Sequence, residues 1–370
     1  MRVIIAGGGT GGHIFPAISI AEEILRRNPE NSVLFIGTRE GLEKRTVFQL
    51  GYNLEFISSR GIVGKGIIRG IRGIASAFKG LIDSFRIMSK FGPDVVLGVG
   101  GYVSGPVVCA AVLLLVPTAI CEQNSIPGIT NRFLGRLVRR VFASFEESVR
   151  FFPRKVTVVV GNPVRTQILL KGKWSQKKRE GITILVFGGS QGARTLNLTV
   201  PRALGILARQ DISIIHQTGE KDVEDVKKSY EWYGIRASVL PFIEDMASAY
   251  SQADLVIGRA GAGTLAEITA IGIPSILVPY PFAAYNHQLE NARIVQRTGA
   301  AVIVEDKDVT PEKFAEILGG LLKNDILEEM AKQAKSLGRP DAAREIVDEI
   351  YQLAGSKYIA TKTQRHQEER

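Results

Sequence analysis

The sequence predicts an α/β fold made of two similar lobes, each a doubly wound parallel sheet. Its 370 residues exceed the usual size of a single hydrophobic core. Short runs rich in valine, isoleucine and leucine alternate with longer amphipathic stretches, and glycine clusters follow several of the runs. Continuous apolar runs of this kind are typical of parallel strands that are buried on both faces.

Seven short apolar runs in the first lobe are expected to be strands, and the stretches 16–27 and 67–90 are expected to be helices. The predicted strands of this lobe are 2–6, 32–36, 54–57, 94–99, 118–121, 140–143 and 156–159. The same alternation restarts at 181–187, and the later predicted strands are 212–216, 238–240, 255–257, 275–278 and 301–304. Each half is therefore predicted to form its own doubly wound sheet.

The composition changes between the two lobes. The segment 171–179 is charged and lacks apolar periodicity, which is typical of a linker. We expect an N-terminal domain at 1–162 and a C-terminal domain at 163–339. A helix within 340–355 is expected to pack back on the first domain, and the polar tail 356–370 is expected to be loose.

The charge and the cysteine content narrow the class of protein. A net charge of +10, from 47 basic and 37 acidic residues, favours phosphate, nucleic acid or an anionic membrane as the partner. Aromatic residues make up only 7% and are scattered, which argues against nucleic-acid binding. The two cysteines, Cys109 and Cys121, form neither a disulfide framework nor a CxxC metal motif, so a reducing compartment is expected.

The sequence offers no signal for export or for crossing a membrane. The N-terminus runs from Met1 through a predicted strand into glycines, without the charged and long apolar regions of a signal peptide. The longest apolar run, 107–116, has 10 residues. A spanning helix needs about 20 residues, so the chain is not expected to span a membrane.

Three glycine-rich segments each follow a predicted strand and open a predicted helix. They are 7–13 (GGGTGGH), 98–106 (GVGGYVSGP) and 188–193 (GGSQGA). Glycine lets the backbone turn with positive φ and approach a ligand closely, and the N–H groups at a helix start favour an anion. A single loop of this kind is often only a tight turn, but three such loops in two lobes favour phosphate binding.

The first loop also matches, over 7–12, the GxGxxG pattern of dinucleotide-binding dehydrogenases. Such an enzyme expects an acidic residue about 20 positions later, at the end of the second strand. Here that strand is followed by 37–39 (GTR), and the first acid is Glu40. No Gly-Lys-Ser/Thr follows the loop either, so the sequence fits neither a dehydrogenase nor a Walker loop.

Two side chains beside these loops are candidates for chemistry. His13 stands where the first loop becomes a helix, and a neutral imidazole there can accept a proton from a hydroxyl nucleophile. Its alternative role is to cap the helix or to fix the loop. Glu267 lies one helical turn beyond Gly263, and its carboxylate can accept hydrogen bonds from two adjacent ribose hydroxyls. Its alternative role is to complement the helix dipole.

Six motifs occur in order along the chain: 8–13 (GGTGGH), 100–106 (GGYVSGP), 122–124 (EQN), 161–165 (GNPVR), 188–193 (GGSQGA) and 259–267 (RAGAGTLAE). With their order and spacing over roughly residues 2–350, they closely resemble the MurG family of bacterial glycosyltransferases. The resemblance implies the glycosyltransferase B architecture, which has two Rossmann-like domains with a cleft between them.

The resemblance also implies an activity. The family transfers N-acetylglucosamine from UDP-N-acetylglucosamine to the C4 hydroxyl of N-acetylmuramic acid in lipid I, and it forms lipid II for peptidoglycan with a β-1,4 bond and inversion. The C-terminal domain would hold the sugar nucleotide, and the N-terminal domain would hold the lipid-linked acceptor. The Tyr102-containing loop and the 122–124 motif favour this enzyme over a sugar-nucleotide epimerase or a glycolipid transferase.

Carried over residue by residue, the resemblance implies His13 as the catalytic base. Ser190 would meet the diphosphate, and Ile243 would present its backbone to uracil. Gln288 and Asn291 would meet the sugar hydroxyls. The other residues implied at the substrate site are Thr10, Gly11, Gly12, Asn124, Arg165, Ala262, Gly263, Thr264, Leu265, Ala266 and Glu267.

Two departures from the family pattern bear on the site. The family often has histidine where this sequence has Cys121, so no accessory proton transfer is expected there and more weight falls on His13. The alignment also allows His287 to take the place of Gln288. The N–H groups of 190–192 are expected to receive the charge that builds on the departing diphosphate, so we expect neither an obligatory metal nor a cofactor.

The segment 60–90 carries the part of the charge excess that can be localised. Its one acid, Asp83, stands among seven basic residues: Arg60, Lys65, Arg69, Arg72, Lys79, Arg86 and Lys90. The apolar residues at helical spacing are Ile67, Ile71, Ile74, Phe78, Leu81 and Phe85. One interpretation assigns this stripe to the core. Because the implied acceptor is anchored in a bilayer, we expect instead that the segment binds anionic lipid. The protein is then expected to be peripheral, on the cytoplasmic face of the plasma membrane.

Overall fold

The computed structural model describes residues 1–8, 11–39, 43–59, 67–171, 181–189, 191–323 and 325–355. Contacts divide the chain into two compact units. Unit 1 comprises Met1–Pro163 and the segment that begins at Asp341, and unit 2 is Val164–Pro340. The predicted linker beyond Lys171 and the predicted loose tail, 356–370, lie outside the described residues.

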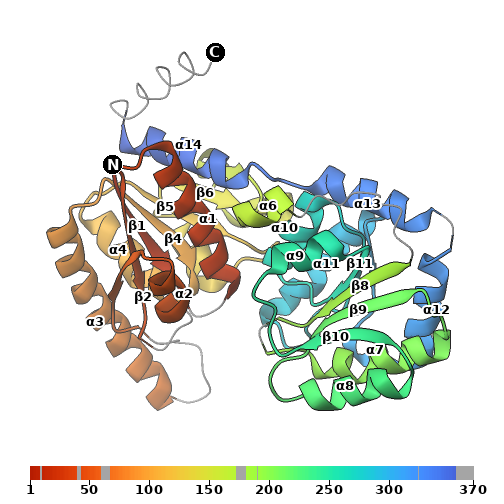
Figure 1. Ribbon diagram of the computed structural model, residues 1–370. Helices are drawn as coiled ribbons and strands as arrows, with labels where there is room; N and C mark the ends of the chain where they lie inside the picture. Colours follow the sequence, from red (N-terminus) through yellow and green to blue (C-terminus); the bar gives the residue numbers. More distant parts are fainter. Residues whose placement is uncertain are drawn as a thin grey trace. The chain divides into compact units, whose positions relative to one another are not determined.

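Unit 1 is built on a parallel sheet whose described strands follow the order β3-β2-β1-β4-β5-β6-β7 (Figure 1). The strands are β1 (Arg2–Gly7), β2 (Ser32–Gly37), β3 (Asn53–Phe56), β4 (Val95–Gly100), β5 (Thr118–Glu122), β6 (Arg140–Ala143) and β7 (Thr157–Val159). The order reverses between β1 and β4, which pair directly in parallel. Every residue of β4 is buried, as expected of a central strand that is covered on both faces.

Helices cover both faces of this sheet. Alternate residues of a strand point to opposite faces, so the apolar strands place side chains in a core on each side. Val3 and Ile5 of β1 pack into one core with α1 and α14, whereas Ile4 and Ala6 pack into a second core with α3 and α4. The helices are α1 (Gly11–Arg27), α2 (Glu43–Gln49), α3 (Ile67–Phe91), α4 (Gly101–Leu113), α5 (Ile129–Leu134) and α14 (Ala342–Ala354), with short 3-10 turns η1 (Glu146–Phe151) and η2 (Arg154–Val156).

The C-terminal helix α14 packs on unit 1, although the chain reaches it only after unit 2. Its apolar face is buried in the same core as α1, and the two helices lie side by side (Figure 1). Two ion pairs flank this apolar contact: Arg27 with Asp348 at 2.6 Å, and Arg140 with Glu349 at 2.8 Å.

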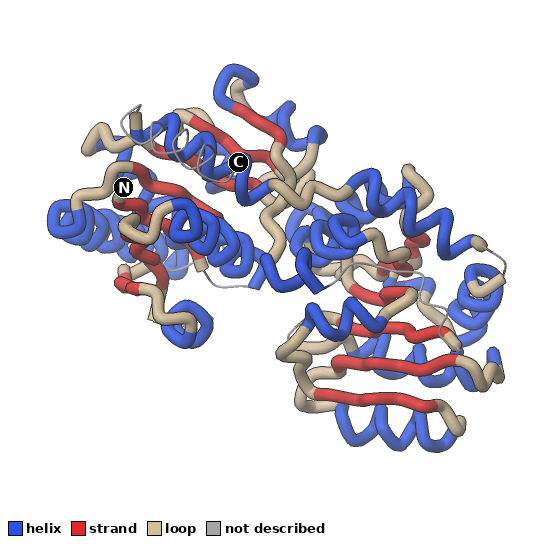
Figure 2. The backbone as a smooth tube through the Cα atoms, turned by 45° about the horizontal axis from the view of Figure 1, so that its top comes forward, coloured by secondary structure: helices blue, strands red, loops and turns tan. Residues whose placement is uncertain are grey.

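Unit 2 repeats the same plan with the described strand order β10-β9-β8-β11-β12-β13, and helices flank its strands (Figure 2). The strands are β8 (Ile182–Phe187), β9 (Ile212–Gln217), β10 (Arg236–Leu240), β11 (Leu255–Gly258), β12 (Ser275–Leu277) and β13 (Ala301–Ile303). The helices are α6 (Thr166–Lys171), α7 (Arg194–Leu207), α8 (Val223–Trp232), α9 (Met246–Gln252), α10 (Ala262–Ile271), α11 (His287–Arg297), α12 (Pro311–Leu321) and α13 (Ile326–Leu337), with 3-10 turns η3 (Ala284–Asn286) and η4 (Asp306–Asp308). Here the order reverses between β8 and β11.

The structure confirms the predicted fold class of two doubly wound parallel sheets. Each predicted strand overlaps an observed one, because a strand buried on both faces leaves a continuous apolar run. The predicted start of the first helix, at residue 16, is wrong, since α1 begins at Gly11 and contains Pro16. Pro16 is the sixth residue of α1, past the first turn, where it removes one main-chain hydrogen bond, and the helix nevertheless continues to Arg27.

Helix α3 contains the described part of the basic segment. Leu81 and Phe85 pack against the core of unit 1, whereas Phe78 and Ile82 are 65% and 39% exposed. Residues 60–66 of the predicted lipid-binding segment lie outside the described residues, and so do the side chains of residues 67–75. None of the described helices is both long and apolar enough to cross a membrane.

Candidate active site

The carboxyl ends of β1 and β4 form the point where the strand order of unit 1 reverses, and ligands of doubly wound sheets bind at such points. Gly11 and Gly12 open α1 there, and His13 follows in its first turn, while Thr10 lies outside the described residues. The ring of His13 lies against Gly100, where an added Cβ would stand 2.6 Å from the imidazole. The structure thus brings two of the three predicted glycine loops together around His13.

Close backbone contacts fix these two loops. Gly101 has a φ of 78°, and a Cβ at this position would lie 2.5 Å from the carbonyl oxygen of Gly8. The buried Ser104 hydroxyl donates to the Ala6 carbonyl at 2.8 Å and accepts from the Gly100 N–H at 2.9 Å. The glycines are therefore required by both conformation and space.

A buried carboxyl at the end of β5 holds Asn124 in place. Glu122 Oε1 accepts from the backbone N–H of Asn124 at 2.9 Å, and Oε2 accepts from Asn131 Nδ2 at 2.8 Å. Burial raises the pKa of Glu122 to about 7, although these hydrogen bonds act in the opposite direction. Sequence analysis did not identify Asn131, because nothing in its local pattern marks an asparagine that pairs with a residue on another element.

Cys121 stands just before this motif, in the core of unit 1. It is 3% exposed, and burial raises the pKa of its thiol well above the usual range. A thiol in this setting behaves as a small apolar core residue rather than as a proton carrier.

In unit 2, the turn after β11 opens α10 without a capping side chain. Gly261 occupies the N-cap position, and no side-chain hydrogen bond is made there. The first N–H groups of a helix have no intrahelical partner, and the dipole adds positive potential, so this end suits an anion. A Cβ at Gly263 would meet only open space, so a ligand can approach the backbone closely.

Glu267, one turn further along α10, is the centre of a hydrogen-bonded cluster. Arg165 donates to its Oε1 from Nε at 3.0 Å and from Nη2 at 2.9 Å, and the Tyr250 hydroxyl donates to Oε2 at 3.0 Å. Burial raises the pKa of Glu267, although the charge of Arg165 acts in the opposite direction. Each carboxylate oxygen has two acceptor positions, so both positions of Oε1 are occupied and one position of Oε2 remains for a ligand hydroxyl.

Tyr250 is a functional candidate that sequence analysis missed. It lies in α9, is fully buried, and has the helical spacing of a core residue. Burial, followed by the charge of Glu267, raises the pKa of its hydroxyl well above the usual range, so the group remains a donor. Only the fold shows that this hydroxyl points at Glu267.

The third glycine loop follows β8 and packs closely on the turn after β9. A Cβ at Gly192 would overlap the carbonyl oxygen of Thr218, and one at Gly219 would lie 2.4 Å from the carbonyl oxygen of Gln191. Both glycines have positive φ. The following helix, α7, also starts without a side-chain cap. Ser190 lies outside the described residues.

Ile243 follows β10, on the other side of β9. Its side chain is buried, and its backbone N–H donates to Gln217 Oε1 at 2.8 Å. The N–H is therefore used within the protein. Of its two backbone polar groups, the carbonyl is the one that the predicted contact with uracil would use.

The predicted sugar-binding residues lie at the start of α11. Gln288 is partly exposed, and its Oε1 accepts from the Tyr280 N–H at 2.9 Å. Asn291 is 0% exposed, so a direct contact with a sugar would require α11 to move, and its role stays a prediction. His287, the alternative to Gln288, places Nδ1 2.7 Å from the Ala284 carbonyl oxygen.

Asp306 and Asp308 form an Asp-x-Asp pattern, so the expectation that the sequence contains no such metal-and-sugar motif, which supported the absence of an obligatory metal, is wrong. Asp306 is already engaged, because Oδ1 pairs with Arg259 and Oδ2 accepts from the Thr195 hydroxyl at 3.2 Å. Within the described ranges, no three histidine, cysteine, aspartate or glutamate side chains are grouped so as to hold a metal ion.

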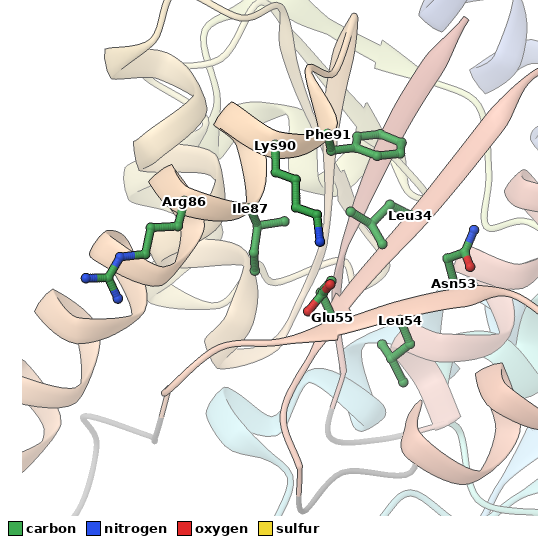
Figure 3. A pocket seen from close by; sticks show the side chains of 8 residues that line it. All are labelled: Leu34, Asn53, Leu54, Glu55, Arg86, Ile87, Lys90 and Phe91. Atoms are coloured by element: carbon green, nitrogen blue, oxygen red, sulfur yellow. The ribbon is translucent and has the colours of Figure 1, made fainter.

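A surface pocket on unit 1 shares no residue with these clusters (Figure 3). It lies between β2, β3 and the last turns of α3. Its lining residues are Leu34, Asn53, Leu54, Glu55, Arg86, Ile87, Lys90 and Phe91. Two of these residues, Arg86 and Lys90, belong to the basic segment predicted to bind anionic lipid, but no residue predicted for the donor or acceptor site lines the pocket.

Two family models match the chain. The glycosyltransferase family 28 N-terminal domain matches residues 3–143, and the glycosyltransferase family 28 C-terminal domain matches residues 183–346. Together the two matches account for most of the 370 residues.

Individual relatives agree with these matches over nearly the whole length. A Syntrophus aciditrophicus protein named UDP-N-acetylglucosamine--N-acetylmuramyl-(pentapeptide) pyrophosphoryl-undecaprenol N-acetylglucosamine transferase is 48% identical, over 94% of this chain and 97% of its own length. The crystal structure of MurG from Acinetobacter baumannii is 34% identical with a TM-score of 0.78, over 94% of this chain and 98% of that one. A UDP-GlcNAc 2-epimerase from Neisseria meningitidis, solved with UDP-GlcNAc, is 14% identical with a TM-score of 0.66, over 95% and 99%, which supports the fold alone.

The predicted resemblance is confirmed by this combination of full-length identity, family matches and shared fold. The chain belongs to glycosyltransferase family 28 and, within it, to the MurG family of N-acetylglucosamine transferases.

Proposed function

We propose that this chain transfers N-acetylglucosamine from UDP-N-acetylglucosamine to the C4 hydroxyl of N-acetylmuramic acid in lipid I, and so forms lipid II. The bond formed is β-1,4, with inversion at the anomeric carbon. The relative that is 48% identical carries the name of this transferase. The structural observation that carries the proposal is the cluster on α10, where an uncapped helix start stands one turn from the carboxylate of Glu267.

The donor binds to unit 2. The diphosphate lies at the N–H groups that open α10 and at the glycine loop after β8, because both are uncapped helix starts at adjacent strand ends. One ribose hydroxyl donates to the remaining acceptor position of Glu267, whose orientation is set by Arg165 and Tyr250. The uracil meets the backbone of Ile243. Gln288 and Asn291 remain the residues proposed for the sugar.

The acceptor binds to unit 1, where His13 acts as the base. The Nδ1 atom of His13 is buried, so Nε2 is the nitrogen that receives the proton of the C4 hydroxyl. Asn124 is held at the neighbouring strand end by Glu122. This arrangement supports an acceptor site at the point where the strand order of unit 1 reverses.

The reaction forms one bond and breaks one. The C4 oxygen attacks the anomeric carbon from the face opposite UDP, and its proton passes to His13. The bond between the anomeric carbon and the diphosphate oxygen breaks, and the electron pair leaves with UDP. The uncapped N–H groups of α10 and of the glycine loop stabilise this developing charge.

Unit 1 also carries the proposed membrane-binding surface, on the cytoplasmic face of the plasma membrane. Phe78 and Ile82 are exposed, and Lys79, Arg86 and Lys90 are exposed on the same helix. The single acid of this segment, Asp83, accepts from the Ser58 N–H, so it points toward the protein. Exposed apolar residues among basic ones are typical of a helix that lies on anionic lipid, and each basic residue contributes about 1 kcal/mol near the surface.

The proposed function is tested by the dependence of UDP release on both substrates. The protein is incubated with lipid I and, in separate reactions, with UDP-N-acetylglucosamine, UDP-glucose or UDP-N-acetylgalactosamine. UDP should be released rapidly only with UDP-N-acetylglucosamine, and omission of lipid I should stop the release. Equal release without lipid I, or a faster reaction with another sugar, would contradict the proposal.

A further inference from the structure

Gln217, the last residue of β9, joins two loops through the two ends of its side-chain amide. Its side chain is buried, with 4% exposed. Nε2 donates to the carbonyl of Gly189 at 2.8 Å, and Oε1 accepts from the N–H of Ile243 at 2.8 Å. Because β9 lies between β8 and β10, the amide spans from the loop after one neighbouring strand to the loop after the other.

The two partners specify a glutamine. A primary amide is an uncharged side-chain group that carries a donor and an acceptor next to each other. It can therefore donate to the Gly189 carbonyl on one side and accept from the Ile243 N–H on the other. Glutamate would place a second oxygen against the Gly189 carbonyl, and methionine would leave both backbone groups without their partner. Leaving buried polar groups unpaired is costly, so each substitution should shift one or both loops.

The turn after Gln217, at Thr218 and Gly219, is held in place by contacts that do not involve Gln217. The Thr218 carbonyl accepts from Asn197 Nδ2 at 2.9 Å, and the Thr218 and Gly219 N–H groups donate to the carbonyls of Leu240, the last residue of β10, and of Pro241. Gly192 and Gly219 pack their backbones against each other's loops without room for a side chain. A change at Gln217 should therefore act on the spacing of the two loops rather than unfold them.

We infer that Gln217 is a positioning residue that sets the distance between the diphosphate-binding loop and the uracil-binding segment. The inference rests on the proposed function, which assigns the loop after β8 to the diphosphate and Ile243 to the base. Because this distance is already fixed, UDP can bind through its base and its diphosphate together. Binding then needs no additional free energy to order the two loops. Gln217 itself needs no contact with the donor.

The inference is tested by comparing the whole ligand with its parts. Binding of UDP, of uridine and of inorganic pyrophosphate is measured for the wild type, for Gln217→Met and for Gln217→Glu, by competition against a fluorescent UDP analogue. UDP affinity should fall roughly five- to thirtyfold in Gln217→Met, the effect of one to two buried hydrogen bonds. Uridine and pyrophosphate should each change by less than about threefold, because each needs only one of the two loops. Gln217→Glu, which keeps the acceptor for Ile243, should lie between the wild type and Gln217→Met.

Tyr230→Phe is the matched control. The Tyr230 hydroxyl is buried and bonds to His216 Nδ1 at 2.8 Å, next to Gln217 on β9, so its partner belongs to the strand and not to either loop. This variant should lower the thermal midpoint about as much as Gln217→Met and leave UDP affinity unchanged. Unchanged UDP affinity in Gln217→Met would overturn the inference. An equal loss for UDP and uridine would also overturn it, since Gln217 would then act on the base segment alone.

Failure of the proposed function has a different signature. If the wild type bound another nucleoside diphosphate more tightly than UDP, the assigned donor would be wrong. The same whole-against-parts comparison with that nucleotide would still show whether Gln217 sets the spacing of the two loops.

Discussion

Replacing Glu267 by glutamine should weaken donor binding and leave acceptor binding almost unchanged. Glutamine has nearly the same shape, and its amide oxygen can still accept both hydrogen bonds from Arg165. The amide nitrogen would face the Tyr250 hydroxyl, which now donates to Oε2. The variant therefore loses the charged acceptor for a ribose hydroxyl and one of the two groups that orient the side chain.

The magnitude follows from the kind of hydrogen bond that is lost. A hydrogen bond to a charged group contributes about 1.5–3 kcal/mol. Since each 1.4 kcal/mol is about a factor of ten in affinity, the dissociation constant for UDP should rise about 10- to 150-fold. Tyr250→Phe removes a donor that orients Glu267 but does not touch UDP, so it should raise the same constant less than Glu267→Gln does.

The assay is calorimetric titration with UDP, together with the KM for donor and acceptor. Glu349→Gln is the control, because Glu349 also forms a partly buried pair with an arginine, Arg140, but in unit 1. This control should leave UDP affinity at the wild-type value. If donor and acceptor KM rose equally in Glu267→Gln, or if UDP affinity did not change, Glu267 would have a structural role only.

Four further outcomes are expected. His13→Ala should lower kcat about 10²–10⁴-fold with UDP affinity near wild type, whereas a variant with most of its kcat would reduce His13 to a loop-fixing residue. Because burial raises the pKa of Glu122 from 4.5 to about 7, the folded protein keeps a proton that the unfolded chain loses, and wild-type stability should fall as pH rises between these values. Glu122→Gln should remove that fall in the thermal midpoint, and equal slopes would refute the assignment. Phe78→Ser combined with Lys79→Glu should weaken salt-sensitive binding to anionic vesicles and spare turnover of a soluble acceptor analogue; unchanged vesicle binding would place the membrane-binding surface elsewhere. Chelation of metal ions should leave the rate almost unchanged, and a strong loss would show that a cation takes part.

The fold could be predicted from the sequence because its strands are buried on both faces. A strand such as β4 carries no polar alternation, and a glycine loop at its end marks where the next helix begins. The start of α1 could not be placed, because Pro16 resembles a helix-opening proline when only the sequence is seen. The burial of the apolar residues in the basic segment could not be predicted either. Phe78 and Phe85 belong to the same helical pattern in α3, yet Phe85 packs against the core and Phe78 is exposed to solvent.

The site could be predicted only where a local motif marks it. Glu267 stands in a motif, but its partner Arg165 is 102 positions away, and their ion pair depends on the fold. Tyr250 and Gln217 have no local signature, because one resembles a core residue and the other the end of a strand. Their roles come from hydrogen bonds between elements that the sequence does not place side by side.

The central claim is tested most directly by identifying the bond that the protein makes. Lipid I and UDP-N-acetylglucosamine labelled at the anomeric carbon are incubated with the wild type, and the lipid product is examined by NMR. We expect N-acetylglucosamine joined to the C4 oxygen of N-acetylmuramic acid, with the coupling constant of a β-linkage. An α-linkage, a sugar attached at another position, or conversion of the sugar nucleotide without transfer would contradict the proposed function.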